Sequence, residues 1–525
     1  MTAVIKRFYP FSVGIVLVTL VTLLGAAPLR AQVFDPHDEA EAAILTNVDR
    51  YFEQVYTDWN IPGMAISIIK DGRLVYARGI GVRDLDHPEI PVDEHTHFKI
   101  ASVSKAFTPV LVAQLVDEGK VDWSTRVRDI LPEFRLKDSI ASELITVKDL
   151  FQHCSGLKAG QGSNLPRLGY GRDAIFTVLP YLEPEYPFRS GYAYQTFFYA
   201  VNALLVERLT GMSWEEAIRT RIFEPLGMTE TTTGAEGLLA CENRAQSHDA
   251  KVRDGRIVAT PIPYGEQPLN RLSVISASGG IISTVTDMAK WLQFHLSNGL
   301  LPDSTRLVSE AQMRKVHRGE NPQTQNDSVL TVYGYGWHVE YGPKGKLYWH
   351  TGSGFGHTDI CFWRPDLQPD LQLGCMISCN ADGLTGSRRA LMRRIIDLYL
   401  GLPDTDYSAR ELAALLRPEA QKNPAEAPKQ PKPAPEAQSL AGTYRNTIGL
   451  GQAVITQEGE NLLITIGPKR WTHPLEHVDG RRFKFRSEGY AFPLTFLRNK
   501  ESGKIDSFRL QFGHGEDFGT WQKIN

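Results

Sequence analysis

The chain has 525 residues, which is more than one ordinary domain needs and predicts about two or three domains. Its composition, 42% apolar and 22% charged, is that of a globular protein that buries a core. The formal net charge of −3 is spread along the chain without a block of like charges, which argues against a nucleic-acid partner.

The N-terminus has the layout of a secretory signal peptide. Lys6 and Arg7 form a short basic region, and the uncharged stretch FSVGIVLVTLVTLLGAA runs from Phe11 to Ala27. Cleavage is expected after Ala31, so residues 1–31 are predicted to be a leader. The mature protein would then be periplasmic or secreted, without stable membrane insertion. An uncleaved anchor is the alternative, because the apolar stretch approaches the length that spans a bilayer.

The predicted elements of residues 32–416 begin with a helix and a hairpin. Apolar residues recur at helical spacing from Asp38 to Trp59. In MAISIIKDGRLVYARGIGV, two apolar runs flank Asp71-Gly72, a dipeptide typical of hairpin turns. Helical patterns follow, and KLYWH, DICFWR and LQLGCMISC then read as strands before a helix that ends at Gly401. This order predicts an α+β (mixed α/β) domain with an antiparallel sheet packed by helices.

Five cysteines allow no complete pairing within a monomer, because the count is odd. Cys375 and Cys379 lie in the predicted buried strand LQLGCMISC, and we expect them to be small apolar core residues.

The composition changes in RPEAQKNPAEAPKQPKPAPEAQ. Its six prolines exclude a continuous helix, so residues 417–439 are predicted to be a semi-rigid linker. Six short strand-like runs follow it: AGTYRN, AVITQEG, NLLITIG, RFKFRSE, LTFLRN and SFRLQFG. They predict a small all-β domain, a sandwich or a barrel, over residues 440–525.

Two serines lie close to one lysine in KIASVSKAFTPV. If a helix begins near Ser102, residues three apart share one face, so Ser102 and Lys105 would face each other while Ser104 points elsewhere. Ser102 is therefore the candidate nucleophile. Lys105 can take its proton only if burial or a nearby cation lowers the pKa of the lysine. By itself a Ser-x-x-Lys motif is weak, because it is common by chance.

Three motifs in this order resemble those of the serine β-lactamase-like and penicillin-binding hydrolases, nearest the class C branch. The first is Ser102 to Lys105. The second is YAYQTFFYAVNALLVERLTG, with Tyr194 at the family's tyrosine position. The third is HTGSG, in which His350-Thr351-Gly352 stands for the family's Lys-Thr-Gly. The connecting stretches ITVKDLFQHCSGL, IFEPLGMTET and GGIISTVTDMAKWL are also similar, so the resemblance covers residues 60–400.

The resemblance implies an acyl-enzyme on Ser102. Lys105 and Tyr194 would share the proton transfers, and which of them is the general base stays open. His350 would complete the catalytic set, and the backbone N–H groups of Ser102 and Ser353 would form the oxyanion hole. The remaining residues expected near the substrate are Thr196, Thr351 and Gly352. No cofactor is implied, and His95-x-His97 lacks a third ligand at a suitable spacing for a metal.

Two residues depart from the family pattern. Thr196 replaces an asparagine or serine, so a hydroxyl stands where an amide could both donate and accept. His350 replaces a lysine, so a group that titrates near neutrality stands where the family holds a fixed positive charge. Both changes weaken the expectation of a potent β-lactamase. The histidine at the third motif resembles the D-aminopeptidase, esterase and peptidase branches of the family. Trp349 and Phe355, beside the third motif, are expected either to line a substrate groove or to pack in the core.

The sequence therefore predicts a serine hydrolase that cleaves amide bonds of short linear peptides, including peptides with D-residues. A carboxylic esterase, a weak β-lactamase and a D-Ala-D-Ala carboxypeptidase are the enzymatic alternatives. A non-catalytic cell-wall-binding protein is the alternative of another class, and the intact nucleophile and base argue against it. The C-terminal segment resembles the lipocalin-like domain of related hydrolases. The expected partner is a small peptide or amide substrate, and an oligomer is left open.

Overall fold

The computed structural model describes residues 33–326, 328–368, 371–417, 430–513 and 516–524. The predicted leader and most of the predicted proline-rich linker lie outside these ranges, and the predicted domain boundaries remain predictions. None of the helices in the described ranges has the length and apolar character needed to cross a bilayer.

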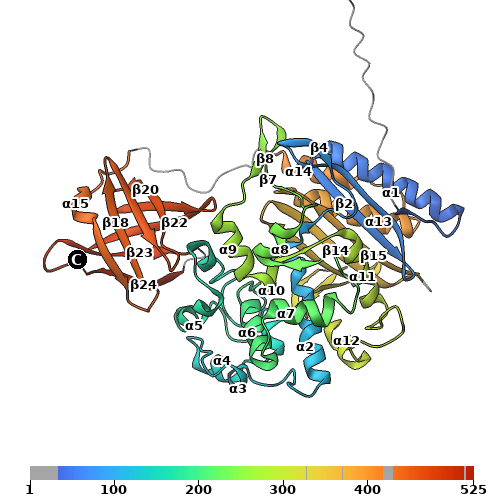
Figure 1. The fold of residues 1–525 in the computed structure, drawn as a ribbon, viewed down its shortest axis with the longest axis horizontal. Helices are drawn as coiled ribbons and strands as arrows, with labels where there is room; N and C mark the ends of the chain where they lie inside the picture. The colour runs from blue at the N-terminus through green and yellow to red at the C-terminus, as the bar shows by residue number, and fades with distance from the viewer. Residues whose placement is uncertain (1–32, 327, 369–370, 418–429, 514–515, 525) are drawn as a thin grey trace, which may run out of the picture. The chain divides into compact units, whose positions relative to one another are not determined.

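A ten-stranded antiparallel sheet organises the region before the barrel (Figure 1). Its strands, in spatial order, are β1 (Val33–Phe34), β3 (Arg73–Asp84), β2 (Gly63–Lys70), β15 (Leu371–Cys379), β14 (His357–Gln368), β13 (Gly345–Gly354), β12 (His338–Gly342), β11 (Leu330–Tyr333) and β10 (Asn321–Gln325), and β4 (His87–Pro91) pairs with β3. β2 pairs with β15, with Met64 opposite Cys379. The two ends of this region therefore close one sheet, as the sequence predicts.

Local sequence explains the first two elements. Helix α1 (Glu39–Asp58) begins after Asp38, whose side chain accepts a hydrogen bond from the Glu41 N–H at 2.8 Å. Asp71 and Gly72 both have positive φ, at 49° and 77°, which is the backbone geometry of a tight hairpin turn. The predicted helix and the predicted hairpin are both confirmed.

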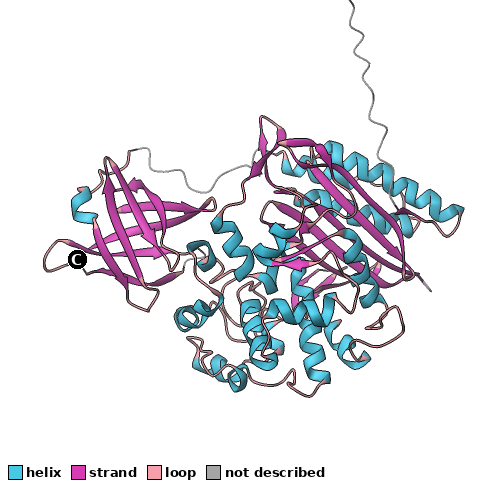
Figure 2. Cartoon of the chain, viewed as in Figure 1, coloured by secondary structure: helices cyan, strands magenta, loops and turns pink. Residues whose placement is uncertain are grey.

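Helices cover both faces of the sheet (Figure 2). One face packs against α1, α13 (Thr385–Tyr399) and α14 (Tyr407–Leu415). The other packs against α2 (Phe107–Asp117) and α11 (Val285–Leu296), and α6 (Phe198–Thr210) lies beyond them in the same apolar cluster. Cys375 and Cys379 are fully buried between the sheet and the first set of helices, as expected, and all five cysteines are free.

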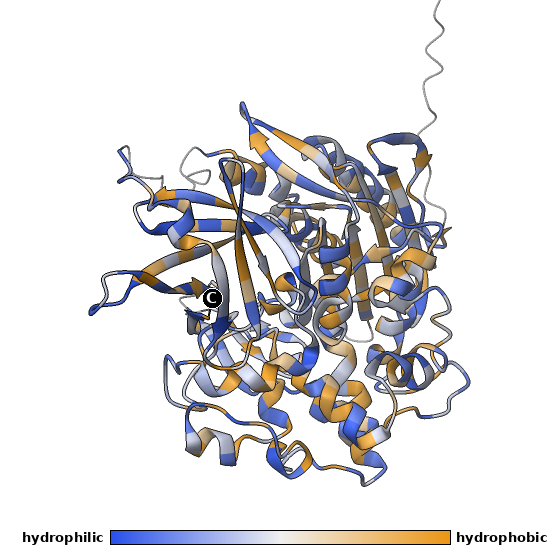
Figure 3. Ribbon diagram, turned by 60° about the vertical axis from the view of Figure 1, so that its left-hand side comes forward, coloured by the Kyte–Doolittle hydropathy of each residue, from blue (hydrophilic) through white to orange (hydrophobic). Residues whose placement is uncertain are grey.

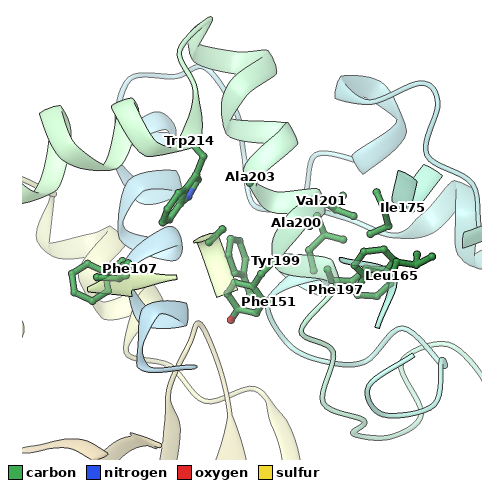
Figure 4. Packing of buried hydrophobic residues seen from close by; sticks show 14 of the residues in the cluster. Phe107, Phe151, Leu165, Ile175, Phe197, Tyr199, Ala200, Val201, Ala203 and Trp214 are labelled. Carbon is green, nitrogen blue, oxygen red and sulfur yellow. The ribbon is translucent and has the colours of Figure 1, made fainter. Parts of the chain in front are cut away.

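The other elements before the barrel are short. They are β5 (Phe98–Lys99), η1 (Ala101–Ala106), α3 (Val127–Ile130), α4 (Ser139–Leu144), η2 (Lys148–Leu150), η3 (Leu165–Leu168), η4 (Arg172–Ala174), α5 (Ile175–Val178), η5 (Leu179–Tyr181), α7 (Trp214–Ile218), η6 (Arg219–Phe223), β6 (Thr232–Thr233), α8 (Gly234–Ala240), β7 (Ser247–Arg253), β8 (Arg256–Ile262), α9 (Glu266–Val274), α10 (Ser276–Gly279), β9 (Ile281–Ser283), α12 (Glu310–Val316) and β16 (Ala381–Asp382). Around α6, side chains from distant segments form one packed cluster (Figure 4): it includes Phe107, Phe151, Leu165, Tyr199 and Trp214. This packing fixes the segment just before α6, which carries the second motif.

The C-terminal segment forms a closed eight-stranded barrel. Its strands are β17 (Gly442–Asn446), β18 (Gln452–Glu458), β19 (Asn461–Ile466), β20 (Trp471–Asp479), β21 (Arg482–Ser487), β22 (Tyr490–Arg498), β23 (Ile505–Gln511) and β24 (Asp517–Lys523), preceded by helix α15 (Ala437–Leu440). Apolar and polar residues alternate along them (Figure 3), so one face of each strand fills the interior. The sequence predicts six of these strands and misses β20 and β24, which contain Pro474 and Gly519, residues that disfavour strands.

Hydrogen bonds join the barrel to residues 162–164, which directly precede η3. The Glu516 carboxylate accepts from the Gly162 N–H at 2.6 Å, and the Asn164 amide donates to the Phe512 carbonyl at 2.7 Å. Burial raises the pKa of Glu516 to about 8. Glu516 is therefore largely protonated at neutral pH.

Candidate active site

Ser102 and Lys105 face each other at the start of the long helical segment. They lie in η1, a 3-10 helix that continues into α2, rather than in an α-helix. Because a 3-10 helix has three residues per turn, residues three apart are eclipsed, and Lys105 Nζ lies 3.2 Å from Ser102 Oγ. Ala101, directly before Ser102, has a φ of 44°, a strained backbone conformation of the kind found at functional sites.

Ser104 has a structural role instead. Its side chain is fully buried, and its Oγ accepts a hydrogen bond from the Ile281 N–H at 3.2 Å. The hydroxyl therefore ties η1 to strand β9 and points away from Lys105, as the helical spacing predicts.

The surroundings of Lys105 favour a neutral amine. The side chain is fully buried, and its Nζ donates to the Ser278 carbonyl at 2.7 Å. The rings of Tyr194 and Tyr199 lie 5.0 and 5.3 Å from Nζ. Desolvation lowers the pKa of Lys105 well below its ordinary value. A neutral Nζ beside a serine hydroxyl can accept its proton.

Tyr194 comes from the segment before α6 and lies next to the Ser102 hydroxyl. Its interaction with Ser102 favours the phenolate, but desolvation is the larger effect and raises the pKa of Tyr194. The His153 ring contacts the Tyr194 ring in a tilted arrangement, with 4.5 Å between centroids, and His153 Nδ1 accepts from the Gln195 N–H at 2.9 Å. These contacts hold Tyr194 in place as a neutral phenol, which is a proton donor rather than a base.

His350 projects from β13 toward Tyr333 and Tyr194. Its Nδ1 donates to the Thr351 carbonyl at 2.8 Å, so its Nε2 accepts from the Tyr333 hydroxyl at 3.0 Å. The His350 and Tyr194 rings are 6.2 Å apart. Burial, with smaller effects of His338 and Lys105, lowers the pKa of His350 well below its ordinary value. His350 therefore stays neutral in the neutral range, although the sequence suggests a group that titrates there.

The rest of the third motif is divided between the two faces of β13. Gly352 lies against η1: a Cβ on it would come within 2.4 Å of the Ile100 carbonyl oxygen, so only glycine fits. The Thr351 side chain lines a cavity on the opposite face, and the exposed Ser353 hydroxyl accepts from Arg388 at 2.9 Å. Only the backbone groups of Thr351 and Ser353 are therefore available to a substrate on the Ser102 side of the sheet. Thr196 lies half-buried just before α6, and its carbonyl accepts from the Tyr199 N–H.

A cavity of about 650 Å³ continues from the end of the third motif. Phe355 lines it, in the turn between β13 and β14, and the Arg271 guanidinium stacks on the Phe355 ring at 3.8 Å. Its other walls combine apolar and charged side chains: Leu238, Tyr264, Leu269, Leu272, Lys99 and Glu488. Phe355 thus lines a cavity, whereas Trp349 stacks on His338 at 4.1 Å and lines the cavity on the opposite face of the sheet.

Some residues of this cluster are not found by sequence reasoning. Tyr333 and Ser278 carry no motif, and His153 lies in the connecting stretch ITVKDLFQHCSGL without a role assigned there. All three reach the site through long-range packing. The stretch LTVYGYGWHVE, which carries Tyr333, contains the only hint, because its aromatic residues alternate beside glycines as in a tight hairpin. Among the described residues, no three His, Cys, Asp or Glu side chains are grouped as metal ligands, and His95 binds Glu230 at 3.0 Å.

Comparison with known families fits this geometry. The family model described as Beta-lactamase matches residues 48–400, which is most of the region before the barrel. The chain belongs to this family. It is thus a β-lactamase-like member of a serine hydrolase family, with a mixed α/β domain and an additional closed barrel.

Named relatives in this family differ in what they act on. Penicillin-binding protein 4 of Amycolatopsis lactamdurans is 29% identical over 76% of this chain and 97% of its own length. Unguisins hydrolase ungD' of Aspergillus campestris is 27% identical over 78% of this chain and 75% of its own. Esterase EstB of Burkholderia gladioli is 26% identical over 67% and 95%. These relatives are therefore named for penicillin binding, for the hydrolysis of unguisins and for ester hydrolysis.

Solved structures support the fold alone. The octameric penicillin-binding protein homologue from Pyrococcus abyssi matches with a TM-score of 0.59 and 22% identity, over 91% of this chain and all of that chain. SurE matches with a TM-score of 0.56 and 20% identity, over 92% of this chain and all of that chain.

Proposed function

We propose that the protein is a serine amidase that hydrolyses amide bonds of short linear peptides, including peptides with D-residues, through an acyl-enzyme on Ser102. The contact between Ser102 Oγ and the buried Lys105 Nζ carries this proposal. A serine becomes nucleophilic only beside a group that can take its proton, and a desolvated lysine is such a group.

In the proposed mechanism, Ser102 Oγ attacks the amide carbonyl carbon while Lys105 Nζ takes the hydroxyl proton. The backbone N–H groups of Ser102 and Ser353 stabilise the negative charge on the carbonyl oxygen. Tyr194, held as a phenol, passes a proton to the leaving nitrogen and is reprotonated from Lys105. Water then adds to the acyl-enzyme by the same route and releases the acid.

His350 has a positioning role in this proposal. As a neutral ring it accepts from the Tyr333 hydroxyl and lies beside Tyr194. It orders the tyrosines but offers no positive charge to a substrate carboxylate, which supports neutral amides over carboxylated substrates such as penicillins. The 650 Å³ cavity beside Phe355 has the size for one short side chain or a few peptide units.

Ester hydrolysis is the second candidate, because the same acyl-enzyme chemistry cleaves esters and a relative is named an esterase. One experiment separates the candidates: kcat/KM measured side by side for D-aminoacyl amides, linear peptides, p-nitrophenyl esters and nitrocefin. Amides or peptides at the top of the series support the proposal. Activity confined to esters would contradict it, and failure of a reactive-serine probe to label the protein would point to the non-catalytic alternative. We also propose export through the predicted leader, and an N-terminal sequence of the mature protein tests this.

A further inference from the structure

A second cavity, of about 640 Å³, lies on the face of the sheet opposite Ser102. Its walls are the hairpin between β12 and β13, the side chains of β13 and β14 that point toward α13, and the helices α13 and α14. The function proposed above gives this cavity no role.

Positive charge dominates its lining. The cationic side chains are Lys344, Arg364, Arg388, Arg389, Arg393 and Arg410, and the one carboxylate among the lining residues is Glu340. Further carboxylates act on these cations: Glu411 pairs with Arg389 and Arg393, Asp397 pairs with Lys344, Asp366 acts on Arg364 from an exposed position, and Asp359 and Asp382 act on Arg388. Among the lining side chains themselves, six cations face one carboxylate.

Arg364 is the least satisfied of these cations. It is 1% exposed, and its Nε and Nη2 have no hydrogen-bond partner among the described residues. The same is true of Nε of Arg388, which is 6% exposed. A buried guanidinium nitrogen without an acceptor is costly, because desolvation removes its water and nothing replaces it. An anion in the cavity would supply the acceptors.

We propose that this cavity binds a small organic anion, a phosphate or carboxylate group attached to an apolar body. Guanidinium groups bind both kinds of oxyanion with paired hydrogen bonds, and Arg364 and Arg388 carry the free donors here. The apolar body would contact the uncharged part of the lining: Leu347, Trp349, Ile360, Met392 and Ile396.

Arg388 also connects the cavity to the third motif. Its Nη1 donates to the Gly352 carbonyl, to Ser353 Oγ at 2.9 Å and to the Asp359 carbonyl at 2.9 Å. An anion that draws this guanidinium toward the cavity would shift the strand that carries the Ser353 N–H. Occupancy of the cavity should therefore change turnover at Ser102 from the other side of the sheet.

Calorimetric titration of the full chain tests the site directly. The probes are phenyl phosphate, phenylacetate, inorganic phosphate and phenol. We expect both aromatic anions to bind, inorganic phosphate to bind more weakly, and phenol not to bind. Comparing the two aromatic anions shows whether the site prefers phosphate or carboxylate. Equal binding of phenol would overturn the proposal, because it would show an apolar pocket without anion recognition.

Two variants and a matched control locate the binding. Arg364→Met should weaken binding of phenyl phosphate by about 10- to 100-fold, the loss typical for hydrogen bonds to a charged group. Arg410→Gln, at an exposed position on α14, should weaken it less and tests the site if Arg364→Met fails to fold. Arg314→Gln, an exposed arginine on α12, is the control and should bind normally. Unchanged affinity in both folded cavity variants would refute the site.

Turnover measures the coupling. With a p-nitrophenyl ester as substrate, saturating phenyl phosphate should change kcat at least about twofold without acting as a competitive inhibitor, and Arg364→Met should remove the effect. Competitive inhibition that persists in Arg364→Met would place the anion at Ser102 and overturn the proposal. Binding at the cavity with unchanged kcat would overturn the coupling.

Discussion

Replacing Lys105 by arginine tests whether a neutral amine is the base. Arginine can reach Ser102 but keeps its proton, so it cannot accept another. A lysine with an ordinary pKa near 10.4 would be neutral in only about one molecule in 2500 at pH 7. Lowering the pKa by burial therefore gains at most about 2500-fold in rate, or about 4.6 kcal/mol, at that pH. We expect Lys105→Arg to lose turnover by about three orders of magnitude.

The assay is the pH dependence of acylation by a p-nitrophenyl ester, followed by stopped flow. Activity of the wild type should fall as the pH drops through the lowered pKa of Lys105, because the protonated amine cannot act as a base. Lys105→Arg should show a low rate without this acid limb. Lys105→Met removes the base without leaving a charge behind, and should be equally slow.

Thermal unfolding provides the control for these variants. The unfolded chain holds a proton on Lys105 that the folded protein does not, so the free energy of unfolding of the wild type should rise with pH up to the unfolded pKa of lysine. Lys105→Met should lack this component and be at least as stable at neutral pH. If Lys105→Arg keeps more than a tenth of the turnover with an unchanged acid limb, the base lies elsewhere, and Tyr194 becomes the first candidate.

Three further predictions concern other groups. Ser102→Ala should abolish turnover, whereas Ser104→Ala should keep most of it but lower the free energy of unfolding by about 1–3 kcal/mol in a denaturant titration, because the Ile281 N–H loses its acceptor. Equal loss of activity in the two variants would reverse the assignment. His350→Ala should reduce kcat by about 10²-fold without moving the acid limb of the pH profile, because burial keeps His350 neutral; a limb that disappears would contradict this. In the wild type, raising the pH from 4.5 to 8 should lower the free energy of unfolding, because the folded protein keeps a proton on Glu516 that the unfolded chain has released. Glu516→Gln should lack this decrease. The loss amounts to at most about 5 kcal/mol, and melting curves at pH 5 and pH 9 should reveal it as a difference from the wild type.

Elements with strong local signals could be predicted from the sequence. The hairpin at Asp71-Gly72 and the apolar strands β13 to β15 have continuous patterns and clear turns. The sequence does not predict strands β10 to β12. β10 is the polar run NPQTQ, which contains Pro322, and β11 and β12 are short runs on either side of the turn with Gly334 and Gly336, so tertiary pairing overrides a weak local preference. The barrel strand β20 pairs across Pro474, which local rules would exclude.

The residues of the candidate site likewise differ in how far the sequence predicts them. Ser102 and Lys105 are one helical turn apart, so their spacing alone predicts their contact. Tyr194 and His350 could be placed by family motifs. Tyr333 could not, because it reaches His350 only through the register of β11, β12 and β13, which no local pattern specifies.

The titratable groups around Ser102 share one electrostatic property: burial favours the neutral form of each. It lowers the pKa of Lys105, His153 and His350 and raises that of Tyr194. A substrate carboxylate next to the scissile bond would have to leave water without a cation in the third motif, whereas an amide or an ester faces no such cost. We therefore propose that the histidine in place of the family's lysine changes which substrate charge the site accepts, while Ser102 and Lys105 keep the roles that the family resemblance implies.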